Sequence, residues 1–130
     1  MQISNEMPAA VRVLIADDHR LFAEALQAIL AAEPRIDVVA HARDGREAVE
    51  LWKEHRPDLI LMDIAMPVMD GVEATREIRA LDDEAFILML TGSNARSDVD
   101  RARKAGATGY VTKDRIAAEL VDAILEVARR

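Results

Sequence analysis

An uninterrupted apolar segment, residues 59–62, places the strongest constraint on the fold of this chain. The segment ends abruptly in the carboxylate of Asp63, and the turn-forming residues Pro67 and Gly71 follow within a few positions. A short apolar run bounded by turn residues is typical of a central strand in a parallel sheet that is covered on both faces. Open α/β sheets bind their ligands at the carboxyl ends of such strands. Asp63 is therefore predicted to lie at a ligand-binding edge, although this stretch alone leaves open that it only caps the next turn.

The same alternation of strand and helix extends along the whole chain. Strands are predicted at residues 11–16, 36–42, 59–62, 86–90 and 108–111. Apolar residues recur at helical spacing after each strand, which predicts five helices. The first helix is expected to bury Leu21, Phe22, Ala25, Leu26, Ile29 and Leu30. The last is expected to start at Asp114 and to bury Ala117, Leu120, Val121, Ile124, Leu125 and Ala128.

Five strand–helix alternations with short connections predict a doubly wound parallel α/β sheet of the flavodoxin-like type, with strand order 2-1-3-4-5. We expect one domain over residues 11–129 after a lead of residues 1–10. The fourth helix, residues 96–105, offers mostly alanine and valine to the core and should be the least tightly held. Gly106 suits the left-handed conformation that ends it, and Asn94 is the better-placed candidate to cap its start.

The amino-acid composition excludes several classes of function. The chain of 130 residues has no cysteine, which excludes disulfides, thiolate metal ligands and cysteine catalysis. Its net charge of −7 argues against general binding to nucleic acid or to an acidic membrane surface. No signal peptide or membrane-spanning run is visible, so a cytoplasmic location is expected.

Polar residues follow four of the predicted strands. Asp17 and Asp18 follow the first, Asp63 the third, Thr91 the fourth and Lys113 the fifth. Parallel strands bring these ends to one edge, where three carboxylates would repel one another without a cation. Oxygen ligands with room for water suit Mg²⁺. A hydroxyl and an ammonium group on the other side suit phosphoryl oxygens, so the set predicts phosphoryl transfer with a carboxylate nucleophile.

These residues also carry a resemblance to a known family. The pattern is DD at 17–18, DIAMPxMDG at 63–71, T at 91 and GAxGYVxK at 106–113. In this order it resembles the receiver domain of bacterial two-component response regulators, over about residues 11–127. The acid pair followed by His19, and Asp114 after the lysine, are most similar to the NarL/LuxR-type subgroup. Members of that subgroup usually carry a C-terminal helix-turn-helix DNA-binding domain, which residues up to 130 do not include.

The resemblance implies the chemistry of the site. Asp63 would accept a phosphoryl group from the phosphohistidine of a sensor histidine kinase. Mg²⁺ would be held by Asp18, Asp63 and the backbone carbonyl of Ala65, with Asp17 assisting. The domain would be a signalling switch that catalyses its own phosphorylation and dephosphorylation, rather than an enzyme in the ordinary sense.

The resemblance also implies how the signal leaves the site. Thr91 and Lys113 would contact the phosphoryl oxygens. Thr91 and Tyr110 would then relay the change to the face formed by the fourth helix, fifth strand and fifth helix. The implied output is transcription regulation, through a phosphorylation-dependent homodimer and a separate DNA-binding domain. Two positions depart from the commonest receiver pattern, because Asp114 stands where many receivers have proline and Ala65 offers no polar side chain near the metal.

Other functions are compatible with parts of the pattern. A Mg²⁺-dependent phosphatase or phosphotransferase of the haloacid-dehalogenase-like type would need a second acid at position 65, which is alanine. A flavin or nucleotide module would need a glycine-rich loop after the first strand. A receiver-like interaction module without phosphorylation remains a third hypothesis. His19, His41 and His55 show no metal-ligand spacing, which predicts structural or surface roles for all three.

Overall fold

The structure, a computed structural model, describes residues 10–92 and 96–128. Most of the expected lead, the expected cap Asn94 and Arg129 lie outside these residues, as does the side chain of Ala128. The strands are β1 Val11–Ala16, β2 Ile36–Ala42, β3 Leu59–Asp63, β4 Ile87–Thr91 and β5 Gly109–Thr112. The helices are α1 Arg20–Ala31, α2 Gly45–His55, α3 Gly71–Leu81, α4 Arg96–Ala105, the short 3₁₀ helix η1 Lys113–Arg115 and α5 Ile116–Ala128.

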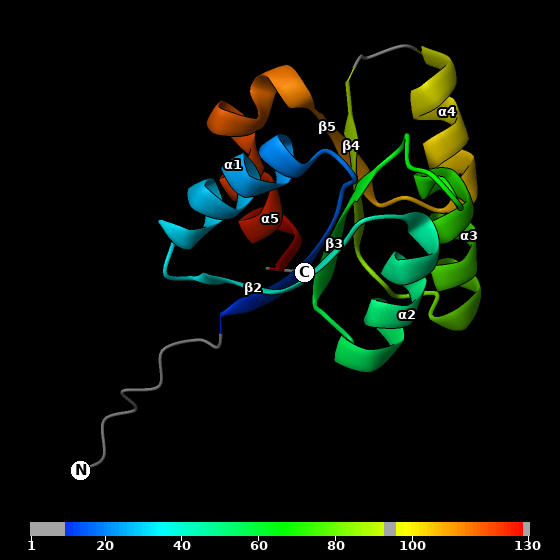
Figure 1. The fold of residues 1–130 in the computed structure, drawn as a ribbon, viewed down its shortest axis with the longest axis horizontal. Coiled ribbons are helices and arrows are strands. Elements are labelled where there is room, and N and C mark those ends of the chain that lie inside the picture. Colours follow the sequence, from blue (N-terminus) through cyan, green and yellow to red (C-terminus); the bar gives the residue numbers. More distant parts are fainter. Residues whose placement is uncertain (1–9, 93–95, 129–130) are drawn as a thin grey trace.

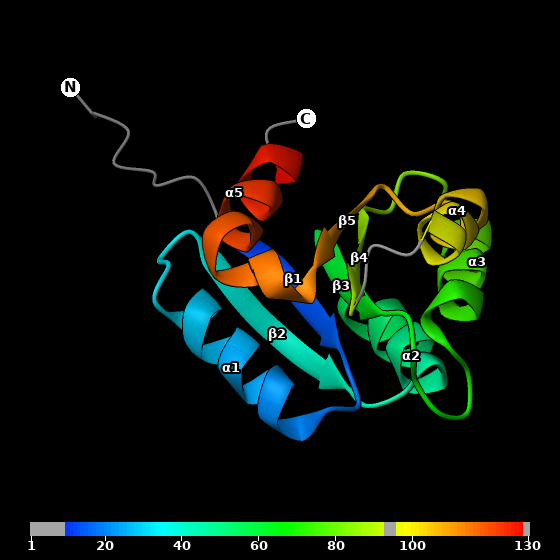
Figure 2. The ribbon, with the colours of Figure 1, turned by 90° about the horizontal axis from the view of Figure 1, so that it is seen from above.

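The five strands form one parallel sheet in the order β2-β1-β3-β4-β5, which confirms the predicted flavodoxin-like topology (Figure 1). Helices α1 and α5 cover one face of the sheet, and α2, α3 and α4 cover the other (Figure 2). The register places Ala16 opposite Met62, Asp63 opposite Leu90 and Thr91 opposite Thr112. The residues that follow β1, β3, β4 and β5 therefore share one edge of the sheet.

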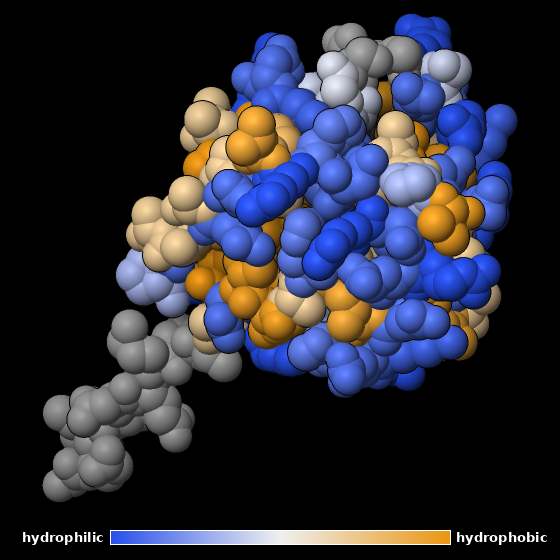
Figure 3. All heavy atoms as spheres, in the orientation of Figure 1, coloured by the Kyte–Doolittle hydropathy of each residue, from blue (hydrophilic) through white to orange (hydrophobic). Residues whose placement is uncertain are grey.

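Two apolar cores form because successive side chains of a strand point to opposite faces. In β3, Ile60 and Met62 pack under α2, α3 and α4, whereas Leu59 and Leu61 pack under α1 and α5. All four side chains are buried, as expected for a central strand covered on both faces. The view in Figure 3 is correspondingly hydrophilic, with apolar atoms scattered among polar ones. Among the described residues, no helix has the length and apolar character needed to span a membrane.

The predicted inward faces of two helices need correction. In α1, Leu21 is 82% exposed and Ala25 is exposed, while Ala23, Leu26 and Leu30 are buried. In α5, Ala117 is exposed, and the buried stripe is Ile116, Leu120, Ile124 and Val127. The helix also starts later than expected, because a 3₁₀ turn occupies Lys113–Arg115. Leu21 and Ala117 are each the second residue of their helix, beside the stripe that packs on the sheet through Leu26 in α1 and Ile116 in α5.

Two glycines bring the loop after β3 close to the helices that flank it. Gly71 donates its N–H to the Ile64 carbonyl at 2.8 Å, and a Cβ at this position would collide with the carbonyl oxygen of Asp63. Gly45 donates to the Met69 carbonyl at 2.8 Å and likewise has no room for a Cβ. The backbone around Asp63 is thus held from two sides.

Helix α4 is the most weakly packed of the five, as predicted. Its only buried residues are Ala102 and Ala105, counted over the described part of the chain. It ends at Gly106, whose φ of +107° confirms the predicted left-handed position. The Arg79 guanidinium in α3 donates to the Gly106 carbonyl through Nε at 3.1 Å and Nη2 at 2.6 Å. The carboxyl end of α4 is therefore fastened by a two-pronged hydrogen bond.

Candidate functional site

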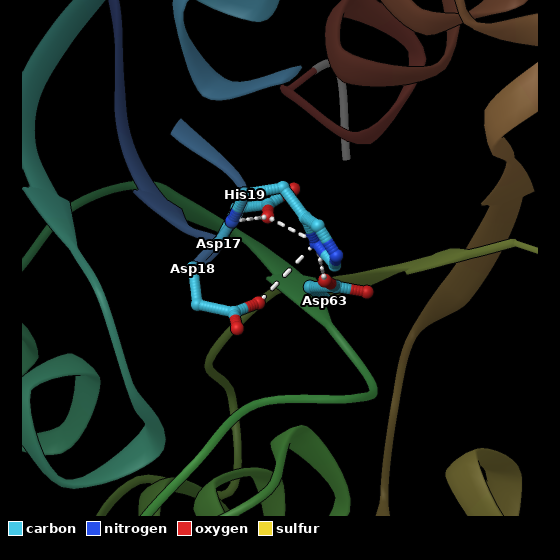
Figure 4. Close-up of side chains that lie close together, drawn as sticks. All are labelled: Asp17, Asp18, His19 and Asp63. Carbon is cyan, nitrogen blue, oxygen red and sulfur yellow. Dashed lines mark hydrogen bonds and ion pairs between the residues drawn. The ribbon is translucent and has the colours of Figure 1, made fainter. Parts of the chain in front are cut away.

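Acidic side chains meet at the carboxyl edge of the sheet. Asp17 and Asp18 follow β1, and Asp63 is the last residue of β3. One ligand atom from each of Asp17, Asp18, His19 and Asp63 lies within 4.8 Å of the others (Figure 4). The structure thus brings together the three carboxylates that the sequence analysis predicted to meet there, and it adds a histidine to them.

Asp17 is fully buried and only partly hydrogen-bonded. Its Oδ1 accepts a hydrogen bond from the backbone N–H of His19 at 2.7 Å. Among the described residues its Oδ2 has no hydrogen-bond partner, and Lys113 Nζ lies 3.7 Å from it. Leaving a buried carboxylate oxygen unsatisfied is costly, and it is a common sign of a ligand or ion site. The backbone carbonyl of Asp17 is also fixed, because His41 Nε2 lies 2.9 Å from it.

Asp63 is 3% exposed and lies between the carboxylate of Asp17 and the ammonium group of Lys113. Burial raises the pKa of Asp63, and the neighbouring charge of Asp17 raises it further. Lys113 acts in the opposite direction, because its Nζ lies 3.3 Å from Asp63 Oδ2 and favours the charged form; His19 contributes in the same sense. The ammonium group is positioned over the ring of Phe22, 4.4 Å from its centroid. The charged form of Asp63 is therefore disfavoured as long as no cation binds to it.

Three other predicted site residues lie around this centre. Thr91 is 2% exposed and ends β4, directly after Leu90, the register partner of Asp63. Tyr110 in β5 is 45% exposed, so it belongs to the surface rather than to the acidic pocket. Ala65 lies exposed in the loop after β3, close in sequence to Asp63. A role for its backbone carbonyl stays a prediction.

The expectation that His19 is a structural or surface residue is only half right. Its side chain is 61% exposed, but its Nδ1 lies 3.3 Å from Asp17 Oδ1 and 3.3 Å from Asp18 Oδ1. The same atom lies 3.6 Å from Asp63 Oδ2. The available signal was its position directly after the acid pair, which a search for spaced metal ligands overlooks.

The donor set fits a divalent cation. Three carboxylates converge, one of them carries an unsatisfied buried oxygen, and the charge of Asp63 is disfavoured without a partner. Hard oxygen ligands of this kind suit Mg²⁺. The Lys113 ammonium lies 3.3 Å from Asp63 Oδ2 and 3.7 Å from Asp17 Oδ2, so it places a positive group beside the acids for an anionic ligand. The edge can therefore hold a cation and an anion next to one carboxylate.

A five-stranded sheet of this order, with an acid cluster and a lysine at its carboxyl edge, defines the receiver class of α/β proteins. Residues 13–125 match the family described as response regulator receiver domain, and the chain belongs to that family. It is 42% identical over 118 residues to the chemotaxis protein CheY of Halobacterium salinarum, covering 91% of this chain and 97% of that protein. Receiver domains bind Mg²⁺ at an acidic pocket, which agrees with the cluster described above.

Two further relatives relate it to transcriptional regulators. It is 43% identical over 119 residues to the transcriptional regulatory protein DegU of Brevibacillus brevis, covering 92% of this chain and 50% of that protein. The solved signal receiver domain of the response regulator NarL from Mycobacterium tuberculosis superposes with a TM-score of 0.89 at 36% identity, covering 94% and 98% of the two chains. The chain spans about half the length of the regulator it matches, so activities of such whole proteins do not transfer directly.

Proposed function

We propose that this domain is the phosphoacceptor of a two-component system and that Asp63 receives a phosphoryl group from the phosphohistidine of a sensor histidine kinase. The observation that carries the proposal is the buried Asp63 carboxylate, held between acids and the Lys113 ammonium. In the transfer, a carboxylate oxygen of Asp63 forms a bond to phosphorus while the phosphorus–nitrogen bond of the phosphohistidine breaks. Family membership favours this role over that of a phosphatase acting on free substrates.

Mg²⁺ would be held by Asp17, Asp18 and Asp63, with the backbone carbonyl of Ala65 as a further ligand. When bound, it supplies positive charge against the phosphoryl oxygens. The unsatisfied buried Oδ2 of Asp17 supports a cation at this place. Through their charge, the acids also exclude anions from the pocket unless such a cation is present.

Lys113 and Thr91 would contact the oxygens of the phosphoryl group carried by Asp63. Lys113 Nζ already lies 3.3 Å from Asp63 Oδ2, so it needs little movement to pair with an oxygen on the transferred group. Thr91 is a buried hydroxyl at the end of the adjacent strand. A phosphoryl group brings a charge of about −1.5 to −2 and strong acceptor oxygens, which draw such donors inward.

The output would leave through α4, β5 and α5. Movement of Thr91 would change the space next to β5, where Tyr110 is half exposed and able to turn inward. The weak packing of α4 on two buried alanines lowers the cost of rearranging this face. By analogy with its regulator relatives, we propose a cytoplasmic protein that dimerises on phosphorylation and controls transcription through a DNA-binding domain.

Phosphorylation at one residue is directly testable. The protein is incubated with Mg²⁺ and acetyl phosphate, and its intact mass is followed with time. We expect the gain of one phosphoryl group in the parent and in Asp37→Asn, whose carboxylate is exposed at the opposite edge of the sheet. We expect no gain in Asp63→Asn. A full gain in Asp63→Asn would overturn the assignment.

The relay needs a separate test. Amide exchange of α4 and β5 is compared with and without beryllofluoride, which mimics the bound phosphoryl group. We expect Thr91→Ala to bind beryllofluoride at Asp63 while losing most of the change in exchange. A response as large as that of the parent would exclude Thr91 as the relay.

A further inference from the structure

The ring of His19 is directed at the acid cluster although most of it is exposed. Its Nδ1 lies 3.3 Å, 3.3 Å and 3.6 Å from carboxylate oxygens of Asp17, Asp18 and Asp63, respectively (Figure 4). It stands at the position that caps α1, yet its side chain makes no capping hydrogen bond. The side chain is therefore not engaged in the helix start, and its inward nitrogen needs another explanation.

The distances themselves distinguish two explanations. A charge-assisted hydrogen bond between an imidazole and a carboxylate is expected at about 2.7–2.9 Å. The observed separations of 3.3–3.6 Å are longer than this for all three carboxylates. Ligand atoms about 2.1 Å from a tetrahedral metal ion lie about 3.4 Å from one another. The distances from Nδ1 to the three oxygens therefore match ligands around a shared ion better than a tight ion pair, and the contact with Asp17 Oδ1 is a long hydrogen bond of 3.3 Å.

A second observation points to the same ion. Asp17 is fully buried, and within residues 10–92 and 96–128 its Oδ2 finds no hydrogen-bond partner; Lys113 Nζ lies 3.7 Å away. The buried oxygen faces the space shared with Asp63, whose Oδ2 contacts the same ammonium. The two oxygens of Asp17 thus differ: Oδ1 makes a long hydrogen bond of 3.3 Å with the His19 Nδ1, whereas Oδ2 is the unsatisfied acceptor. Both oxygens lie at the acid cluster, so an ion bound there could use either.

The chemistry of the donor set determines the metal. Mg²⁺ selects oxygen ligands, whereas imidazole nitrogen suits zinc, copper, iron and nickel ions. For a given site of nitrogen and oxygen donors, affinity among divalent ions rises from manganese toward nickel and copper. A site with three carboxylates and one imidazole should therefore distinguish these ions from Mg²⁺ more strongly than carboxylates alone.

We propose that His19 is a direct nitrogen ligand in the acidic pocket and gives it a preference for first-row transition-metal dications such as Ni²⁺ and Zn²⁺ over Mg²⁺. The inference rests on the proposed function, because the same carboxylates would hold the cation. The imidazole of His19 would be an additional ligand, and the choice of metal would depend on this one residue. The exposed ring is free to turn toward an ion that enters from solvent.

The test compares two metals on two variants by calorimetric titration, with circular dichroism to verify folding. For His19→Ala we expect Ni²⁺ affinity to fall at least tenfold while Mg²⁺ affinity changes less than twofold. The control is His55→Ala, which removes a histidine paired with Glu54 at the end of α2 and should change neither affinity. The visible absorption bands of bound Co²⁺ should also shift in His19→Ala, since an oxygen ligand replaces nitrogen.

The outcomes separate this inference from the proposed function. Unchanged Ni²⁺ affinity in His19→Ala, or an equal fall for both metals, would overturn the role of His19 as a nitrogen ligand while leaving the Mg²⁺ site intact. If the parent binds neither metal, the cation site of the proposed function fails as well. Phosphorylation of Asp63 in Mg²⁺ tests that function without involving His19.

Discussion

Replacing Lys113 with methionine should destabilise the domain in a way that depends on pH and on divalent ions. The substitution keeps a side chain of similar length but removes the ammonium group, which lies 3.3 Å from Asp63 Oδ2, 3.7 Å from Asp17 Oδ2 and 4.4 Å from the centroid of the Phe22 ring. With an effective dielectric constant of about 20, these two attractions amount to about 5 and 4.5 kcal/mol before desolvation. Both acids are buried, so removing the cation leaves them uncompensated.

The net effect is smaller than these Coulomb energies. Breaking a buried ion pair by removing one partner costs about 3–5 kcal/mol. The Lys113 side chain is 21% exposed, so water screens part of the interaction and we expect the lower end, about 3 kcal/mol. This value applies above neutral pH without divalent ions. Saturating Mg²⁺ should reduce the loss, because a ligand that binds only the folded state stabilises it.

The sign of the pH dependence follows from Asp63. Its pKa is raised above the ordinary 3.8 in the folded protein, and Lys113 opposes that rise. Without Lys113 the folded-state pKa rises further. A pKa that is higher in the folded than in the unfolded state stabilises the fold at pH values below the unfolded-state pKa. This stabilisation is lost as the pH rises through the folded-state pKa. The penalty of Lys113→Met should therefore be small near pH 3.8 and grow with pH.

The assay is urea unfolding at a series of pH values, with and without Mg²⁺. Lys104→Met is a matched control, because Lys104 is an exposed lysine in the last turn of α4. If Lys113→Met matched this control at every pH, the ammonium would not neutralise the acid pocket, and the reasoning from its distances would be refuted.

Three further predictions concern other parts of the structure. Val68 has a φ of +68° and is 76% exposed, so Val68→Gly should relieve strain and raise the unfolding free energy by about 1 kcal/mol in urea, unlike Val68→Ala. Arg79→Met removes two hydrogen bonds to the Gly106 carbonyl and should lower the unfolding free energy by about 1–2 kcal/mol. Amide exchange should become faster than in the parent, and the increase should be larger in α4 than in α2. Asp63→Asn should raise the melting temperature without Mg²⁺ at neutral pH, because it removes a buried charge, and the gain should vanish in acid, where Asp63 is protonated.

The topology and the acid cluster were predictable for a single physical reason. Central parallel strands are apolar on both faces, so each strand ends visibly where the first polar residue appears. Asp63 and Thr91 could therefore be placed at strand ends from the sequence, and parallel pairing brings such ends to one edge. Lys113 reaches the same edge from β5, where its ammonium contacts Asp63.

Features that depend on side-chain direction were not predictable in this way. The imidazole of His19 reaches the cluster from the N-cap position before α1, where the backbone is extended and helical periodicity does not determine the side-chain direction. Leu21 and Ala117 are exposed although Leu26, Leu30, Leu120 and Ile124 are buried as predicted, because each is the second residue of its helix and lies beside the stripe that packs on the sheet. The pKa of Asp63 likewise depends on burial and on Asp17, which only the folded arrangement defines.

The attachment of α4 at one end gives the helix an asymmetric stiffness. Arg79 binds the carbonyl of Gly106 at the carboxyl end of the helix. Among the described residues, the body of α4 buries Ala102 and Ala105, and its Arg101 forms an ion pair with Asp70 at 3.6 Å. The amino end of α4 is the end nearer in sequence to Thr91, the last residue of β4. We expect the helix to behave as a lever with its pivot at Gly106. A small displacement at the end of β4 would then swing the amino end through a larger arc than the carboxyl end, converting a local change in charge into a change of surface shape.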